Sequence, residues 1–262
     1  MDKKSLLDRL AQSGEQRLLL ARALDKYEQC QRRSMPTFFG FLSPAEQQEV
    51  RQMLTAGGIS AGYCFLGGYA RAERRLLLVL PDWQEAPEEE AAMDFLRANF
   101  REGERLSHRD ILGSLMALSI AREKIGDILL TEHSADLVVS REIADYLLEQ
   151  WSSAGRVALK VSRIGQEELV VPAAKVKEIR DTVATLRLDA VTAAGFSISR
   201  TKAGELIRAG RVQRNYKEAL KNDLLVAQGD VISARGLGKF ELAEVGGLSK
   251  KGRTAILLRR YL

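Results

Sequence analysis

Hydrophobic residues recur three or four positions apart in the first part of the chain, against a charged background. This spacing places them on one face of an amphipathic helix interrupted near Gly14. The residues concerned are Leu6, Leu10, Leu18, Leu19, Ala21 and Leu24. A further helix should begin at Ser43-Pro44-Ala45-Glu46, because serine caps a helix, proline fits its first position and glutamate reaches back to the cap. It should end at Gly57-Gly58, which makes residues 1–72 a predicted helical N-terminal domain.

Two apolar runs follow, and they predict a hairpin. Residues 59–69 and 74–80 have strand-like composition and are joined by a charged turn at 71–73. Ahead of the capped helix stand three aromatic residues, Phe38, Phe39 and Phe41. Two interpretations apply to them: they pack in a core or staple the helix, or they form a platform for stacking nucleic-acid bases.

The middle of the chain alternates between strand and helix patterns. Strands are predicted near 93–100, 127–131, 136–139 and 157–164, with helices capped by Ser107 and Ser140. The resulting order, β-helix-β-β-helix-β, is typical of a ferredoxin-like or RRM-like sheet with two helices on one face. Residues 73–181 are therefore a predicted RRM-like middle domain. No aromatic-rich RNP1 motif occurs on these strands, so base stacking on the sheet is not supported; a scaffold role and RNA contact both remain open.

The last part of the chain, residues 182–262, predicts two short helices and glycine-punctuated strands. Apolar residues at helical spacing run up to Gly195, which is expected to stop the first helix in the left-handed conformation. Ser199 is placed to cap the second helix, and Gly210 to end it. A strand is predicted over 231–235.

Charge is distributed unevenly along the sequence. From Leu186 to the C-terminus there are 15 Lys and Arg against 7 Asp and Glu, whereas the rest of the chain has a net charge of −3. This asymmetry points to a polyanion partner. Arg200 and Lys202 lie in the first turn of a predicted helix, where acidic residues would favour stability and where cations reinforce a phosphate site. We expect reversal of both charges to abolish RNA binding and leave the fold intact.

An ordered series of residues runs through this basic segment. It consists of Leu188-Asp189, Ser199-Arg200, Ala203, Leu206-Ile207, Gly210, Val212, Asn215, Gly229-Asp230 and Arg235-Gly236. By this series the segment resembles the S4 domain, the RNA-binding fold of ribosomal protein S4 and of many RNA-modifying proteins. The resemblance implies an RNA-facing surface made of Ser199, Arg200, Lys202, Arg208, Arg211, Arg235 and Lys239. The predicted RNA-binding set also includes Arg214 and Asn215. Tyr216 stands where S4 domains usually have glycine, which leaves the shape of that turn open.

Over its whole length the chain is similar to the YlmH family of bacterial S4-domain proteins. The phrases that carry this similarity are Phe41-Leu42-Ser43-Pro44, Leu80-Pro81-Asp82-Trp83, Leu106-Ser107-His108-Arg109-Asp110 and Arg122-Glu123-Lys124-Ile125-Gly126-Asp127-Ile128. The resemblance implies an α+β protein with a helical N-terminal unit, an RRM-like middle domain and a C-terminal S4 domain. It further implies ribosome association, quality control of stalled large subunits that still hold peptidyl-tRNA, and a link to cell division in Gram-positive bacteria.

His108 and Arg109 have three possible roles. They lie in a helix start where Ser107 and Asp110 form a capping box, so they are part of the cap alone, contact RNA phosphate, or take part in catalysis. We include both residues in the predicted RNA-binding set. Gly126-Asp127 is open in the same way, between a structural turn or acceptor and an active-site base.

Arg187-Leu188-Asp189 looks like the RLD motif of pseudouridine synthases, many of which carry an S4 domain. In those enzymes the motif lies in a separate, large catalytic domain, whereas here it opens the predicted S4 helix. The glycine-rich loop of a methyltransferase and the Walker-type GxxxxGK[ST] phosphate-binding motif do not occur in the sequence. We predict a protein without enzymatic activity; the alternative is an rRNA- or tRNA-modifying enzyme that uses its S4 domain for targeting.

The remaining features set the expected partners. Cys30 and Cys64 form neither a disulfide framework nor a zinc motif, and no metal, cofactor or catalytic residue is predicted. The sequence has no signal-peptide core and no apolar run of about 20 residues that would cross a membrane. We expect a cytoplasmic monomer that binds structured RNA (rRNA and tRNA) and the large ribosomal subunit.

Overall fold

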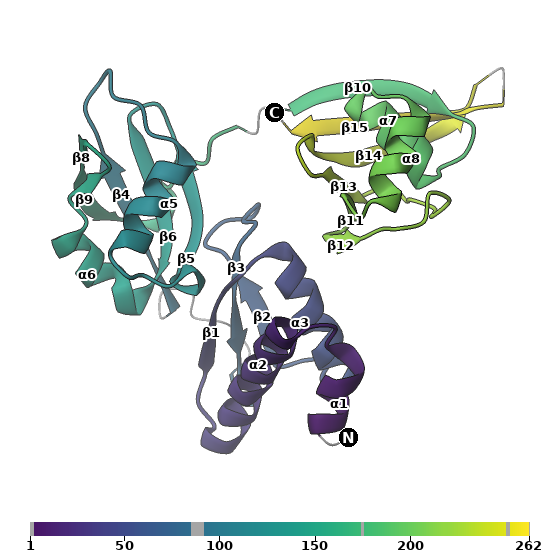
Figure 1. Cartoon of the computed structure of the whole chain (residues 1–262). Coiled ribbons are helices and arrows are strands. Elements are labelled where there is room, and N and C mark those ends of the chain that lie inside the picture. Colours follow the sequence, from purple (N-terminus) through teal and green to yellow (C-terminus); the bar gives the residue numbers. More distant parts are fainter. Residues whose placement is uncertain (1–2, 85–91, 174–175, 250–251, 262) are drawn as a thin grey trace. The chain divides into compact units, whose positions relative to one another are not determined.

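The computed structural model describes residues 3–84, 92–173, 176–249 and 252–261 (Figure 1). The chain divides into unit 1, residues Met1–Pro172, and unit 2, residues Ala173–Leu262. Each unit combines helices with antiparallel sheets and has hydrophobic clusters of its own. The predicted α+β class is confirmed.

Unit 1 begins with three helices packed on a three-stranded sheet. The helices are α1 (Lys3–Leu10), α2 (Gly14–Arg33) and α3 (Pro44–Ala56), and the sheet order is β1 (Thr37–Leu42), β3 (Arg75–Val79), β2 (Tyr63–Leu66). The predicted hairpin is β2 paired with β3. Ser43 and Glu46 form the predicted capping box, and the helix they start ends before Gly57, as expected.

Strand β1 was not predicted, and it explains the aromatic residues ahead of α3. The pairing of β1 with β3 shifts register between Phe39 and Phe41, so that Gly40 forms a bulge. Phe39 packs with the core under the helices, whereas Phe41 packs in a second cluster on the other side. Both rings are buried, 4% and 1% exposed, which confirms core packing for them and rules out a stacking platform.

The second half of unit 1 has the predicted ferredoxin-like order. Its elements are β4 (Met93–Asn99), α5 (His108–Ala117), η1 (Arg122–Lys124), β5 (Ile125–Leu130), β6 (Ser134–Ser140), α6 (Arg141–Gln150), β7 (Ser153–Ala154), β8 (Val157–Ala158), β9 (Lys160–Ile164) and η2 (Gln166–Glu168). The sheet order is β5-β6-β4-β9, and its strand pairs are antiparallel. Residues of α5 and α6, such as Ile111 and Leu147, share a core with alternate strand residues. Ser140 occupies the predicted N-cap position of α6, but its side chain makes no capping hydrogen bond.

The other face of this sheet is covered by the N-terminal part of the same unit. Phe41, Leu76 and Leu78 from β1 and β3 form one buried cluster with Phe95 and Val138 from β4 and β6. Because side chains alternate between the two faces of a strand, Phe95 and Val138 point away from the side that α5 and α6 cover. The three-stranded and four-stranded sheets of unit 1 therefore share a core.

Asp127 joins the two halves of unit 1. Its carboxylate accepts hydrogen bonds from the Tyr69 hydroxyl at 2.7 Å and from the backbone N–H groups of Glu73 and Arg74 at 2.7 and 3.0 Å. The preceding Gly126 leaves no room for a side chain, since a Cβ there would lie 2.9 Å from the Phe41 ring. Of the two roles open for Gly126-Asp127, the structural one accounts for these contacts.

Unit 2 is a six-stranded sheet with two helices on one face. The strand order is β10 (Val176–Val183), β15 (Thr254–Tyr261), β14 (Gly238–Leu248), β13 (Val231–Ala234), β11 (Val212–Arg214), β12 (Lys217–Glu218). Helices α7 (Leu188–Phe196) and α8 (Arg200–Arg208) pack onto the sheet through a core that includes Leu188, Ile207 and Phe240. The S4 prediction named the helices and β13 but neither β10 nor β15.

Two strands pair with strands on the other side of an expected domain boundary. β3 follows residue 72 in the chain but pairs with β1 and β2, and most of β10 precedes residue 182 but pairs with β15 along eight residues. The division into 1–72, 73–181 and 182–262 remains a prediction.

Two glycines at the ends of predicted helices have different roles. Gly195 does not stop α7; it lies inside the helix, where a Cβ would be 2.3 Å from the Phe240 ring, and the left-handed residue is Ser197 with φ 56°. That prediction is wrong because close packing, not chain reversal, requires the glycine. Gly210 has φ 67° directly after α8, so its predicted role as a stop is confirmed.

Candidate RNA interface

A buried carboxylate holds the start of α8 against the start of α7. Asp189 is 6% exposed and accepts hydrogen bonds from two guanidinium groups, those of Arg187 at 3.3 and 3.1 Å and of Arg200 at 3.1 Å to both oxygens. Burial alone would raise the pKa of Asp189, but these hydrogen bonds and charges hold the pKa below its usual value. We call these three residues the Asp189 cluster. Arg200 therefore stabilises the fold as well as presenting a charge, and the expectation that its charge can be reversed without cost needs revision.

The first turn of α8 presents the charge that the sequence predicts. The Ser199 hydroxyl accepts a hydrogen bond from the Lys202 backbone N–H at 3.1 Å, which confirms the predicted cap. Lys202 is exposed and pairs with Glu205, with 3.1 Å between Nζ and Oε2. Exposed pairs of this kind contribute at most about 1 kcal/mol, so Lys202 can exchange this partner for a phosphate at small cost.

A second buried carboxylate organises the β11–β12 turn. Asp230 is 6% exposed and accepts from Arg214 Nε at 2.6 Å, Asn215 Nδ2 at 2.6 Å and the Ala227 backbone N–H at 2.7 Å. Although burial raises it, these partners keep the pKa of Asp230 below its usual value. Arg214, Asn215 and Asp230 form the Asp230 cluster. In this arrangement the polar atoms of the two predicted RNA-binding residues hold the fold together.

The same turn resolves the question raised by Tyr216. Asn215 and Tyr216 have φ 49° and 65° and connect β11 to β12, since Arg214 pairs with Lys217. Positive φ at both central residues is what a type I′ hairpin turn requires. Tyrosine is unfavourable there, but Asn215 anchors the turn with three hydrogen bonds. Its side-chain Nδ2 donates to the Asp230 carboxylate, its side-chain oxygen accepts from the Val231 N–H, and its backbone N–H donates to the Val231 carbonyl.

Arg211 and Arg235 meet at one end of the sheet. Arg211 Nη2 donates to the Arg235 carbonyl at 3.0 Å, and the Arg235 N–H donates to the Arg211 carbonyl at 2.9 Å. Both residues are exposed, as is Arg208, whose Nη1 donates to the side-chain oxygen of Asn222 at 2.8 Å. Lys239 lies elsewhere on the sheet, with its Nζ 5.1 Å from the Tyr261 ring centroid. The structure thus brings Arg211 and Arg235 together and sets Ser199, Arg200 and Lys202 in one turn.

His108 and Arg109 belong to unit 1. They follow Ser107, whose hydroxyl accepts from the Asp110 N–H at 3.2 Å while the Asp110 carboxylate accepts from the Ser107 N–H at 2.8 Å, as the capping box predicts. Desolvation and the nearby charge of Arg122 lower the pKa of His108. Arg109 is exposed and carries the only permanent charge of the two.

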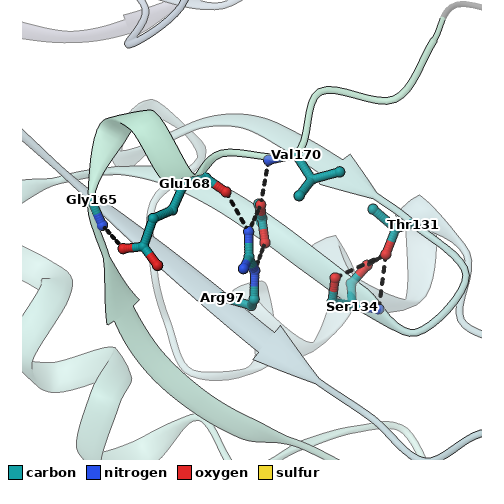
Figure 2. A network of polar contacts seen from close by, with 7 residues as sticks. Arg97, Thr131, Ser134, Gly165, Glu168 and Val170 are labelled. Carbon is teal, nitrogen blue, oxygen red and sulfur yellow. Dashed lines mark hydrogen bonds and ion pairs between the residues drawn. The ribbon is translucent and has the colours of Figure 1, made fainter.

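A buried ion pair on the middle sheet was not predicted from the sequence (Figure 2). Asp136 is fully buried and accepts from Arg97 Nε and Nη2, both at 2.7 Å, and from the Val170 N–H at 2.8 Å. Arg97 also donates to the Glu168 carbonyl at 2.6 Å. These bonds hold the segment around η2 over the sheet face opposite α5 and α6. The sequence signal for this ion pair was one charged residue at an inward-facing position on each of two strands, Arg97 on β4 and Asp136 on β6, which pair with each other.

The face that RRM domains use for stacking bases is therefore occupied in this protein. The N-terminal sheet covers part of it through Phe41 and Leu78, and the Arg97–Asp136 pair fixes residues 168–170 nearby. This agrees with the absence of an RNP1 motif.

Two properties of the described residues bear on other functions. Among them, no group of three or more His, Cys, Asp or Glu side chains is placed to hold a metal ion. Nor does any helix in the described ranges have the length and apolar character to cross a membrane.

Comparison with known families locates two domains in the chain. Residues 98–168 match the family model described as "Putative RNA-binding domain in YlmH", and residues 186–232 match the S4 domain. The chain is also 35% identical over 223 residues to ribosome-associated protein quality control protein P2 of Bacillus subtilis (strain 168), a match that covers 84% of this chain and 85% of the relative.

The fold is shared with a solved structure of another protein. Cell division protein ylmH from Streptococcus pneumoniae aligns with a TM-score of 0.50 at 18% sequence identity, over 61% of this chain and 97% of that one. At this level of identity the match speaks for the fold alone.

Proposed function

The chain belongs to the YlmH family of RNA-binding, ribosome-associated quality control proteins, and on this basis we propose that it binds the large ribosomal subunit while peptidyl-tRNA is still attached. The quality-control name of the Bacillus relative supports this role. We extend the proposal to a link with cell division, the link that the resemblance to the YlmH family implies.

The observation that carries the proposal is the exposed basic surface of unit 2 on a rigid frame. Lys202, Arg208, Arg211 and Arg235 are exposed, while the buried Asp189 and Asp230 clusters fix the helix and turn beside them. Cations on a preorganised scaffold contact phosphates without first losing much conformational freedom. Affinity then comes from phosphate contacts, and selectivity from the shape of the folded RNA.

Binding without chemistry is part of the proposal. In the RLD sequence, the side chain that could act as a nucleophile is Asp189, and it is buried between Arg187 and Arg200. A carboxylate held by two guanidinium groups has its lone pairs engaged and is poorly placed to attack a base. The alternative, an RNA-modifying enzyme, would have to place its reaction elsewhere. We further propose that the protein acts in the cytoplasm as a monomer.

Sedimentation through a sucrose gradient tests the proposal. The wild-type protein should sediment with large subunits. A larger share of it should be found on subunits that hold peptidyl-tRNA than on subunits without it. The variant Lys202→Gln with Arg211→Gln should remain near the top of the gradient. Its matched control, Lys4→Gln with Arg9→Gln, removes one lysine and one arginine from exposed sites in α1, outside both matched domains, and should sediment like the wild type.

Two results would contradict the proposal. Wild-type protein that stays at the top of the gradient would exclude stable subunit binding, and equal loss in the control would indicate a general charge effect. A pseudouridylation or methylation assay on bulk RNA addresses the alternative: product formation by the purified protein would establish an enzyme.

A further inference from the structure

Strand β10 leaves one edge of the unit 2 sheet open. It stands at the end of the strand order and pairs with β15, and no other strand that the structure describes pairs with it (Figure 1). Most of its eight residues are exposed. An edge of this kind presents backbone N–H and C=O groups that can bond to a further strand.

Alternate residues of β10 direct their backbone groups to the open edge. The Thr182 N–H donates to the Asp181 carboxylate at 2.7 Å and the Thr182 carbonyl accepts from Arg253, so the backbone of Thr182 faces away from β15. The pairing with β15 runs in continuous register. The backbone groups of Glu178 and Arg180 therefore face the open edge as well, and those of Thr182 at its end are already engaged.

The charges along β10 are complementary to themselves. The strand carries, in order, Lys177, Glu178, Ile179, Arg180 and Asp181. A second β10 can run antiparallel to the first with Ile179 opposite its own copy. In this register Glu178 lies opposite Arg180 of the other copy, and Lys177 lies opposite Asp181. Every facing pair of charges then has opposite signs, which stabilises neighbouring strands, whereas like charges destabilise them.

Other registers lack this property. A shift by one residue in one direction places Lys177 opposite Arg180, and a shift in the other direction places Glu178 opposite Asp181. The centred register also fits the backbone, because the open-edge groups of Glu178 meet those of Arg180 and such a pair exchanges two hydrogen bonds. Charges on an edge strand ordinarily prevent pairing with other chains. The order of charges on β10 instead favours one partner, a second copy of this strand.

We propose that two copies of this chain associate through β10, antiparallel and about a twofold axis at Ile179. The Arg180 and Glu178 side chains are 82% and 49% exposed and lie 4.0 Å apart within one chain. Glu178 also lies 3.8 Å from Arg259. Exposed contacts of this kind are weak, so both side chains can turn to a facing strand. The monomer proposed above is the form that acts on the large subunit, and the pairing concerns the free protein.

Sedimentation velocity of the full chain without RNA tests the proposal. Because a single strand pair is a small interface, dimers should form between about 10 μM and 1 mM. Arg180→Glu places two carboxylates opposite each other on both sides of the axis and should weaken association about tenfold or more. Arg9→Glu, the same charge change at an exposed site in α1, is the matched control and should associate like the wild type. A wild-type protein that stays monomeric, or equal association of Arg180→Glu, would overturn the proposal.

Exchanging the two charges gives a sharper test. The double variant Glu178→Arg with Arg180→Glu restores opposite charges between its own copies, so it should associate with itself. It should not associate with the wild type, because every contact between these two positions then joins like charges. A double variant that remains monomeric, or that mixes freely with wild-type chains, would contradict the register.

Cross-linking locates the axis. In the proposed dimer the two copies of Ile179 form a pair without hydrogen bonds, whose Cα atoms lie about 4.5 Å apart, within the range that a disulfide spans. Ile179→Cys should therefore form a disulfide-linked dimer on oxidation. Lys177→Cys should not, since an offset of four residues separates its two copies by roughly 13 Å. The wild type, with Cys30 and Cys64, gives the background.

Equal cross-linking of the two cysteine variants would indicate random collision and overturn the proposal. Neither RNA nor ribosomes enter these experiments. Failure of the β10 pairing therefore leaves the proposed function intact, and failure of large-subunit binding leaves the pairing intact.

Discussion

Replacing Arg200 by glutamine should destabilise unit 2, whereas replacing Lys202 two residues later should not. Arg200 donates to both oxygens of Asp189 at 3.1 Å, and Asp189 is 6% exposed. Lys202 pairs with an exposed glutamate in the same helix. The two residues have equal charge and lie in the same turn, so the comparison separates structural from electrostatic roles.

The expected loss follows from burial. Breaking a fully buried ion pair costs about 3–5 kcal/mol, but the Arg200 side chain is 55% exposed and Arg187 still neutralises Asp189. A loss of about 1–2 kcal/mol is therefore expected for Arg200→Gln, against less than about 0.5 kcal/mol for Lys202→Gln. For a unit of this size, the larger loss lowers the unfolding temperature by roughly 5–15 °C.

Scanning calorimetry of the full chain measures the loss, with hydrogen exchange of the α7 and α8 amides assigning the transition to unit 2. Both variants should bind structured RNA more weakly, because each loses a cation at the helix start. An unfolding temperature for Arg200→Gln equal to that of the wild type would show that Arg187 alone satisfies Asp189. The reasoning from burial would then be wrong. Arg200→Glu should be worse than Arg200→Gln, since it places a carboxylate beside a buried one.

Three more outcomes are expected. With about five basic residues engaged, log affinity for RNA should fall against log salt with a slope of several units, at roughly 0.7–0.9 for each phosphate neutralised; a nearly flat response in filter binding would point to docking through protein instead. A fragment of residues 173–262 should fold and bind RNA with reduced preference for large subunits. A fragment starting at Thr182 should aggregate, because it lacks most of β10 and exposes the edge of β15. Equal solubility and equal circular dichroism spectra of the two fragments would contradict the role given to β10. The pKa values of Asp189 and Asp230 are lowered in the folded state. The stability that these carboxylates contribute is therefore present above the unfolded pKa of about 4 and should be lost as the pH falls below it, so acid titration should unfold unit 2 in that range. An unfolding temperature that is independent of pH between about 5 and 2 would contradict this assignment.

Local signals in the sequence were sufficient for most helices. The boxes at Ser43 and Ser107 depend on residues three positions apart, so their geometry is determined within one helical turn. The order of strands and helices in the middle of the chain was equally local, because each strand is a short apolar run between turn residues. These features led to the ferredoxin-like order.

The missed features depend on distant partners. Strand β10 is largely exposed and rich in charge, and only its pairing with β15, more than seventy residues later, makes it a strand. The role of Gly195 depends on Phe240, and that of Arg200 on Asp189 at the start of another helix. In the candidate site, the sequence therefore identified the basic residues but did not separate Arg200, Arg214 and Asn215, which hold buried carboxylates, from Lys202, Arg211 and Arg235.

The shared core of the two sheets in unit 1 constrains how this protein can evolve. Phe41 and Leu78 from one sheet and Phe95 and Val138 from the other are buried by each other, and Asp127 ties the same two halves together. A recombination event that exchanged the first 80 residues for an unrelated segment would leave an apolar sheet face open to water and to self-association. We expect the two halves to be inherited and replaced as a single block, with compensating changes on both sides wherever one side varies.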